Sequence, residues 1–202
     1  MRKIDERILY QGHWLTLKEA RFQTEDGSEI RWESVERRAS RTVLVVIARL
    51  APSDRIVLIK QYRPSVERWI LGFPAGIWES GLLEDAAMAE LKEETGYKGR
   101  VVATSIPLKL NSGIMNEDLY VLDAEVDEMD PINWNPQQEL ELEEEIQVVT
   151  VERTRIALYL AEEADCGTQV AAGLWYAFRQ ESHPPSCNPQ AIGGYPPSLR
   201  NR

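Results

Sequence analysis

Three glutamates near the end of a predicted helix have a spacing that suits metal binding. Glu90, Glu93 and Glu94 occupy positions i, i+3 and i+4, which places three mutually repelling carboxylates on one helix face. Hard oxygen ligands with no companion Cys or His indicate Mg²⁺ or Mn²⁺ rather than Zn²⁺. Because protein-bound Mg²⁺ usually completes its shell with water and substrate phosphate, the pattern indicates chemistry at a phosphate. From spacing alone, a solvated acidic surface is the competing interpretation.

A turn-rich loop followed by a helix must position these glutamates. In the stretch FPAGIWESGLLEDAAMAELKEETGY, Pro74 and Gly76 interrupt regular structure just before the helix. The helix is expected to begin near residues 82–83, with Ser80 as a candidate N-cap, and Gly96 is expected to end it in the left-handed conformation. The apolar side, which should pack on a sheet, consists of Leu83, Ala87 and Leu91, with Met88 alongside.

Strands are expected to form that sheet. Apolar runs at residues 42–50 and 56–63 predict two buried strands in a hairpin, and a brief strand follows at 69–71. Further strands are expected at 99–108, 119–126 and 146–151, and helices at roughly 153–163 and 168–180. Residues 8–47 show β-type patterning with a turn at Asp26 and Gly27, which predicts an N-terminal sheet of two or three strands.

The chain is expected to divide into three parts. Residues 1–40 form the N-terminal sheet, residues 41–180 the main domain, and residues 181–202, rich in Pro, Ser, Asn and Gly, a flexible tail. Within the main domain, the acidic and proline-containing segment 127–145 is predicted to be a long loop. Its length makes it a candidate functional element.

The composition is that of a soluble globular protein with 202 residues, 43% hydrophobic and 28% charged. No apolar run reaches the ~18 residues of a membrane helix, and MRKIDERILY lacks the apolar core of a secretion signal, so we expect a cytoplasmic protein without a membrane partner. A net charge of -10 argues against nucleic acid as a partner and requires local cations for an anionic substrate. Cys166 and Cys187 provide no disulfide framework, and with His13 and His183 they show no metal-ligand spacing.

Five segments of the chain resemble a known family. AELKEETGY at residues 89–97 resembles the second half of the signature box of the Nudix hydrolases. The segments that resemble the ADP-ribose pyrophosphatase group of that family are residues 33–38 after Trp32, 60–64, 73–76 and 111–117. The resemblance covers roughly residues 8–180. It implies an α/β fold, namely an α/β/α sandwich around a mixed sheet, with an N-terminal antiparallel sheet used for dimerisation.

The same resemblance implies roles for the acidic residues. Glu90 and Glu94 would be metal ligands, Glu93 a ligand or a catalytic partner beside them, and the backbone carbonyl of Ala75 a further ligand. The metal would neutralise the pyrophosphate and lower the pKa of water. The catalytic base would come from the acidic loop, with Glu145 the best match and Glu144 the second. A disordered acidic loop is the competing interpretation.

On the substrate side, the resemblance assigns binding roles to residues outside the helix. Trp14 and Trp32 would sandwich the adenine, one from each subunit of a homodimer, although core or interface packing is the alternative for both. Arg63 and Arg37 would contact the phosphate or ribose side, with plain surface charge as the alternative. The remaining candidates are Glu33 at the purine edge and the loop around Ser112 and Gly113 beside the ribose and phosphate.

Three positions depart from the family pattern. The first glutamate of the box falls on Gly81 or Leu82, the box arginine is Ala89, and a glutamate before the loop proline is Gly72. The three glutamates that would carry the metal are retained. The resemblance therefore implies Mg²⁺-dependent hydrolysis of ADP-ribose to AMP and ribose 5-phosphate, or of a related nucleoside diphosphate sugar. The alternative is a module that binds such a nucleotide without hydrolysing it.

Overall fold

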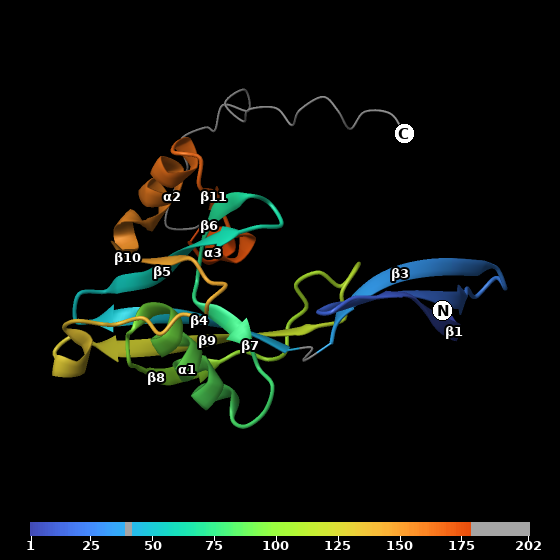
Figure 1. The fold of residues 1–202 in the computed structure, drawn as a ribbon, viewed down its shortest axis with the longest axis horizontal. Helices are drawn as coiled ribbons and strands as arrows, with labels where there is room; N and C mark the ends of the chain where they lie inside the picture. The colour runs from blue at the N-terminus through green and yellow to red at the C-terminus, as the bar shows by residue number, and fades with distance from the viewer. Residues whose placement is uncertain (39–41, 179–202) are drawn as a thin grey trace.

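The computed structural model of the chain describes residues 1–38 and 42–178. Two sheets and three α-helices account for most of the regular structure in these ranges (Figure 1). In chain order, the elements are β1 (Arg2–Gln11), β2 (Leu15–Gln23), β3 (Glu29–Arg37), β4 (Thr42–Ala51), β5 (Arg55–Arg63), β6 (Arg68–Gly72), β7 (Ala75–Ile77), α1 (Leu83–Thr95), β8 (Arg100–Thr104), β9 (Asp118–Asp127), η1 (Pro131–Asn133), β10 (Ile146–Glu152), η2 (Arg153–Arg155), α2 (Ile156–Asp165), β11 (Gln169–Val170) and α3 (Ala172–Phe178).

The larger sheet is mixed. Its strands follow the order β11-β6-β5-β4-β9-β8, with β10 paired to β5 and β7 paired to β4. β4 runs parallel to β9 from Thr42 opposite Asp118 to Ala51 opposite Asp127, and β11 runs parallel to β6. The other pairs in this sheet are antiparallel.

Helices cover both faces of this sheet, and alternate residues of β4 supply both cores. Leu44 and Val46 pack with Ala87 and Leu91 of α1, because successive strand residues point to opposite faces. Val45 lies against the second core, which contains apolar residues of α2 and α3. Figure 1 shows α1 in green on one side of the sheet and α2 and α3 in orange on the other. The predicted α/β/α sandwich around a mixed sheet is confirmed.

The ends of α1 agree with the prediction except at its cap. The helix begins at Leu83, but its N-cap residue is Leu82, which makes no side-chain capping bond. Ser80 as N-cap is therefore wrong, because Gly81, with φ +88°, turns the chain between Ser80 and the helix. Gly96 ends α1 with φ 78°, as expected, and its N–H donates to the carbonyl of Lys92 at 2.7 Å.

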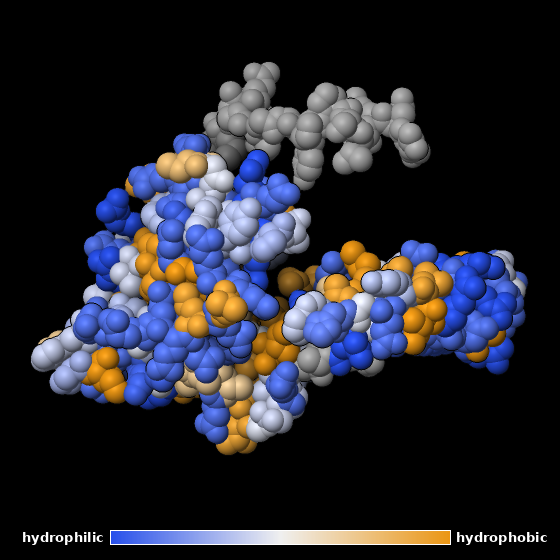
Figure 2. Space-filling model, in the orientation of Figure 1, coloured by the Kyte–Doolittle hydropathy of each residue, from blue (hydrophilic) through white to orange (hydrophobic). Residues whose placement is uncertain are grey.

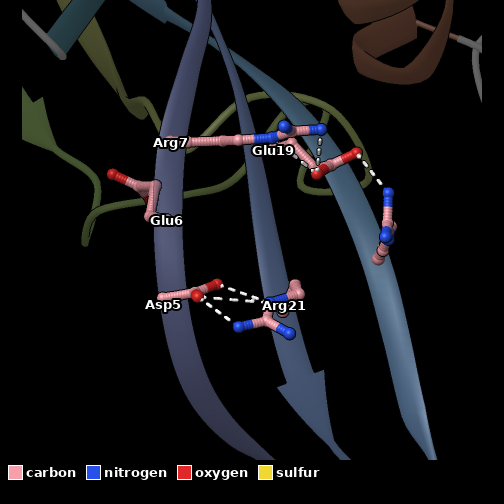
Figure 3. A pocket seen from close by; sticks show the side chains of 6 residues that line it. Asp5, Glu6, Arg7, Glu19 and Arg21 are labelled. Atoms are coloured by element: carbon pink, nitrogen blue, oxygen red, sulfur yellow. Dashed lines mark hydrogen bonds and ion pairs between the residues drawn. The ribbon is translucent and has the colours of Figure 1, made fainter.

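The N-terminal sheet has three strands, β1-β2-β3, all antiparallel, and extends away from the body of the molecule (Figure 1). One hollow on it, of about 310 Å³, is lined by six charged residues. Figure 3 shows Arg7 reaching toward Glu19 and Arg21 toward Asp5, with ion-pair distances of 2.9 and 2.5 Å. Because acidic and basic side chains of neighbouring strands pair with one another here, we interpret these residues as links between the strands and not as a binding site.

The C-terminal part differs from the prediction in one element. Residues 168–180 were expected to be helical, but Gln169 and Val170 pair with β6 as β11, and α3 covers Ala172–Phe178. Residues 179–180 of that prediction lie outside the described part of the chain. The predicted tail, 181–202, lies outside the described residues, and the division into three parts stays a prediction. In the described ranges, no helix is both long and apolar enough to cross a bilayer. The cytoplasmic compartment likewise stays a prediction.

Candidate active site

Two carboxylates of α1 lie against the backbone of the loop that precedes it. Glu94 is 2% exposed, and its Oε2 accepts a hydrogen bond from the backbone N–H of Ala75 at 2.9 Å. The Glu90 carboxyl group packs over Gly76 so closely that a Cβ there would lie 1.9 Å from its Cδ. Helical spacing places Glu90 and Glu94 one turn apart, while Glu93 is exposed. The three glutamates therefore differ in their contact with the loop.

This placement disfavours ionisation of both carboxylates. Burial raises the pKa of Glu90 to about 7, and the charges of Glu93, Glu144 and Glu141 add to the effect. Burial also raises the pKa of Glu94 to about 8, with Glu90 and Glu144 adding to the shift, while the Ala75 N–H opposes it. Like charges held together away from water are stabilised by a cation. The site thus has the electrostatic character expected of a cation-binding face.

Residues 139–145, at the end of the acidic segment, form a turn beside α1, the acidic turn. Within it, the N–H of Glu141 donates to the Glu144 carboxylate at 3.1 Å, and the N–H of Glu144 donates to the Glu141 carbonyl at 3.2 Å. The charge of Glu144 acts on Glu90 and Glu94. Glu145 is exposed, and its carbonyl accepts the N–H of Tyr62 at 3.1 Å. The charge of Glu144, the second candidate base, therefore contributes to the electrostatic environment of the carboxylate face.

Two further charged residues, Arg63 and Glu141, affect the pKa values of the carboxylates, and only Arg63 had a predicted role in the site. Arg63, a predicted substrate ligand, ends β5, and its positive charge partly opposes the rise in the pKa of Glu94. Glu141 contributes to the raised pKa of Glu90 but had no predicted role. No sequence signal singles it out among the glutamates of the acidic segment, because its position depends on the turn.

A second group of predicted residues joins the N-terminal sheet to the loop at 111–117. The indole N–H of Trp32 donates to the carbonyl of Gly113 at 3.0 Å. Arg37 forms an ion pair with the buried Glu117, with Nε to Oε2 at 2.9 Å. The backbone N–H of Val35 donates to the carbonyl of Ile114 at 2.8 Å. These contacts fix Trp32 and Arg37 within this group.

Three further candidates have exposed side chains in this chain. Trp14 is 68% exposed and makes an edge-on ring contact with His13. Ser112 is exposed in the loop. Glu33 lies next to Trp32 on β3, so the two side chains point to opposite faces of the sheet. In one chain, Glu33 and Trp32 therefore do not face the same surface. Figure 2 shows apolar side chains where the N-terminal sheet meets the body and along the sheet itself.

The carboxylate face fits a hard divalent cation, although it is not a preassembled centre. Within residues 1–38 and 42–178, no three Asp, Glu, His or Cys side chains converge as a ready metal site. Mutual repulsion opposes such convergence while no cation is bound. The donors at hand are carboxylate oxygens of Glu90 and Glu94, with Glu93 nearby, and oxygen donors suit Mg²⁺ and Mn²⁺. The absent Cβ of Gly76 leaves the space that the Glu90 carboxyl occupies.

Adding one methyl group at Gly76 should damage this face without unfolding the protein. In Gly76→Ala the new Cβ would overlap the Glu90 carboxyl, at 1.9 Å from Oε1, and would displace it. We expect the affinity for Mg²⁺, measured by isothermal titration calorimetry, to fall about tenfold or more, since one ligand would be misplaced. Gly173→Ala is the control, because nothing lies within 4 Å of its Cβ position. Equal affinities in the two variants would contradict this account of Glu90.

Comparison with known proteins agrees with this geometry. The model of the NUDIX domain family matches residues 39–164 of the chain. A Caenorhabditis elegans protein named "Putative nudix hydrolase 2" is 34% identical over 165 residues, covering 77% of this chain and 74% of that protein. The ADP-ribose pyrophosphatase of Saccharomyces cerevisiae is 32% identical over 148 residues, covering 69% of this chain and 64% of the yeast protein, just under two thirds of its length.

A solved structure supports the fold. The crystal structure of an ADP compounds hydrolase superposes with a TM-score of 0.63 over 80% of this chain and 84% of that chain, at 17% identity. The predicted resemblance to Nudix hydrolases and to their ADP-ribose pyrophosphatase group is confirmed by these matches. With a family model that covers more than half of its residues, the chain belongs to the Nudix family.

Proposed function

We propose that the chain hydrolyses the pyrophosphate bond of ADP-ribose, giving AMP and ribose 5-phosphate, or the same bond of a related nucleoside diphosphate sugar. The observation that carries the proposal is the carboxylate face of α1, where Glu90 and Glu94 lie against residues 75–76. Arg63 and Glu144 act electrostatically on Glu94 from two further elements. A carboxylate face that a cation would stabilise, together with an arginine and an acidic turn, suits hydrolysis at a phosphate.

In this proposal, Mg²⁺, or Mn²⁺ in its place, is held by Glu90 and Glu94, with Glu93 and the Ala75 carbonyl as further candidates. When bound, the metal would neutralise the diphosphate and lower the pKa of water. Arg63 binds a phosphate oxygen of the substrate through its guanidinium group. The carboxylate of Glu144, or of Glu145 as the sequence match favours, accepts the proton of the attacking water. The bond between phosphorus and the bridging oxygen then breaks, releasing the two monophosphates.

The N-terminal sheet completes the proposal through a homodimer. Trp14 and Trp32 are 68% and 49% exposed in the single chain, which is a large apolar exposure for indole rings. We propose that a second copy covers this region and that the two indoles, one from each subunit, bind the adenine. Arg37, already paired with Glu117, would then hold the loop at 111–117 in place beside the ribose.

Purified protein given ADP-ribose and Mg²⁺ should release AMP, and Glu94→Gln should abolish the release. The substitution keeps the shape of the side chain but removes the negative charge that the metal requires. Product formation is followed by ion-exchange chromatography of the nucleotides, with a panel of nucleoside diphosphate sugars run in parallel to identify the preferred substrate. Glu84→Gln is the control, since Glu84 is exposed in the first turn of the same helix.

AMP release by Glu94→Gln at the wild-type rate would refute the metal assignment.

A second candidate function, binding without hydrolysis, is favoured by the departures at Gly72, Gly81 and Ala89. It predicts tight ADP-ribose binding with no AMP over hours in Mg²⁺ or Mn²⁺. Turnover by the wild-type protein excludes it.

Trp14→Ala should raise the KM for ADP-ribose while leaving kcat nearly unchanged. Loss of one stacking contact of about 1–3 kcal/mol corresponds to roughly a 5- to 150-fold change in affinity. Steady-state kinetics give the comparison, and sedimentation equilibrium gives the oligomeric state. Trp134→Ala is a matched control, because Trp134 is 69% exposed but follows η1, outside the N-terminal sheet. An unchanged KM in Trp14→Ala, or a fully active monomer, would count against the shared adenine site.

A further inference from the structure

The C-terminal turn of α1 is capped by a segment that leads into the acidic turn. The last carbonyls of a helix have no partner within it. Here the carbonyl of Glu93 accepts the backbone N–H of Glu139 at 2.8 Å, and the carbonyl of Glu94 accepts the side-chain amide of Gln138 at 2.6 Å. The start of the acidic turn is thus bonded directly to the helix that carries the carboxylate face.

Gly96 makes this close approach feasible. A Cβ at Gly96 would lie 2.3 Å from the backbone nitrogen of Gln137 and 2.6 Å from the carbonyl carbon of Pro136. Only a residue without a Cβ lets the chain pass at this distance, and the φ of 78° also favours glycine. The glycine that ends α1 therefore also sets the path of residues 136–139.

Gln138 connects the two elements on either side of the acidic turn. Its Nε2 donates to the carbonyl of Glu94 on α1 and lies 3.3 Å from the carbonyl of Ile146, the first residue of β10. Both partners are carbonyl oxygens, so the group between them must be a donor, and the two amide hydrogens of Gln meet that need. A glutamate of the same shape would place a negative oxygen against two acceptors.

The turn between these anchors is short and carries Glu144, the candidate base. Gln138 and Glu139 attach its beginning to α1, and Glu145 attaches its end to Tyr62 of β5. Between them, the N–H of Glu141 donates to the Glu144 carboxylate at 3.1 Å, and the N–H of Glu144 donates to the Glu141 carbonyl at 3.2 Å. The position of the Glu144 carboxylate relative to Glu94 consequently depends on the bridge between α1 and β10.

We propose that Gln138 is a positioning residue that holds the acidic turn, with its candidate base, against the C-terminal end of α1, the helix that carries the carboxylate face. The inference rests on the proposed function, because the positioned group acts in that reaction. Gln138 itself does not touch the substrate in this proposal. It acts by fixing the distance between the proton acceptor and the site of attack, and a displacement of about 1 Å at such a site can lower the rate about a hundredfold.

The experiment compares Gln138→Ala and Gln138→Glu with Gln137→Ala in the full chain. Among the described residues, the side chain of Gln137 donates to carbonyls of its own segment, those of Asn135 and Pro136, so its removal leaves the bridge intact. We expect kcat for ADP-ribose hydrolysis to fall about tenfold to a hundredfold in both Gln138 variants, with KM changed less than twofold. Gln137→Ala should behave as wild type. A general loss of folding would instead lower the active fraction and the melting temperature together.

Hydrogen–deuterium exchange supplies a readout that does not depend on activity. Amides of residues 139–146 should exchange faster in Gln138→Ala and Gln138→Glu, while the core amides of α1 and β4 keep wild-type protection. Wild-type exchange of this segment in both variants would overturn the inference, and so would an unchanged kcat in Gln138→Glu. If the wild-type protein releases no AMP, the proposed function fails by itself, and the exchange comparison still decides whether Gln138 holds the turn.

Discussion

The contact between the Glu94 carboxylate and the Ala75 N–H joins the two halves of this site. Glu94 belongs to α1, which the sheet holds through the fully buried Ala87 and Leu91. Ala75 belongs to β7, which pairs with β4 at the centre of the same sheet. One partly buried hydrogen bond of 2.9 Å thus fixes the loop over the helix. Glu90 packs over Gly76 of the same loop, and the acidic turn is attached to the end of the same helix through Gln138 and Glu139.

The departures from the family pattern, at Gly72, Gly81 and Ala89, lie around residues 75–78 and outside that segment. Ala89 is exposed on α1, and Gly81 lies in the turn before it, so neither position leaves an unpaired charge in the interior. Trp78 packs against the core under α1, and its backbone N–H donates to the carbonyl of Thr42 at 3.1 Å. Strand pairing and apolar burial therefore position residues 75–78 without the missing box glutamate and arginine.

Sequence periodicity predicted the parts of the fold that depend on local physics. Apolar runs gave the buried strands, and Gly96 gave the end of α1, because a left-handed C-terminal residue is a local requirement. The shared face of Glu90 and Glu94 follows from helix geometry alone. Burial does not follow from helix geometry. The contrast between the buried Glu94 and the exposed Glu93 depends on how the loop packs on the helix, which the spacing of the glutamates does not predict.

Contacts between segments that are distant in the sequence could not be predicted from its patterns. Glu144 and Glu145 are consecutive acids with nearly identical surroundings in sequence, and tertiary and turn contacts distinguish them. The Glu144 carboxylate accepts the N–H of Glu141, whereas the Glu145 carbonyl accepts the N–H of Tyr62. Gln138 carries no motif, since its role depends on two carbonyls brought together by tertiary packing. Ser80 was a reasonable cap by residue type, but the left-handed turn at Gly81 separates it from the first helical residue.

The most direct measurement of the central claim, a cation site on the carboxylate face of α1, is Mn²⁺ binding followed by electron paramagnetic resonance without substrate. The double variant Glu90→Gln/Glu94→Gln is compared with Glu84→Gln/Asp85→Asn, which removes the same charge from exposed positions of the same helix. We predict that the wild type and the Glu84/Asp85 variant bind Mn²⁺ and that the Glu90/Glu94 variant does not. Equal Mn²⁺ binding by all three proteins would contradict the account.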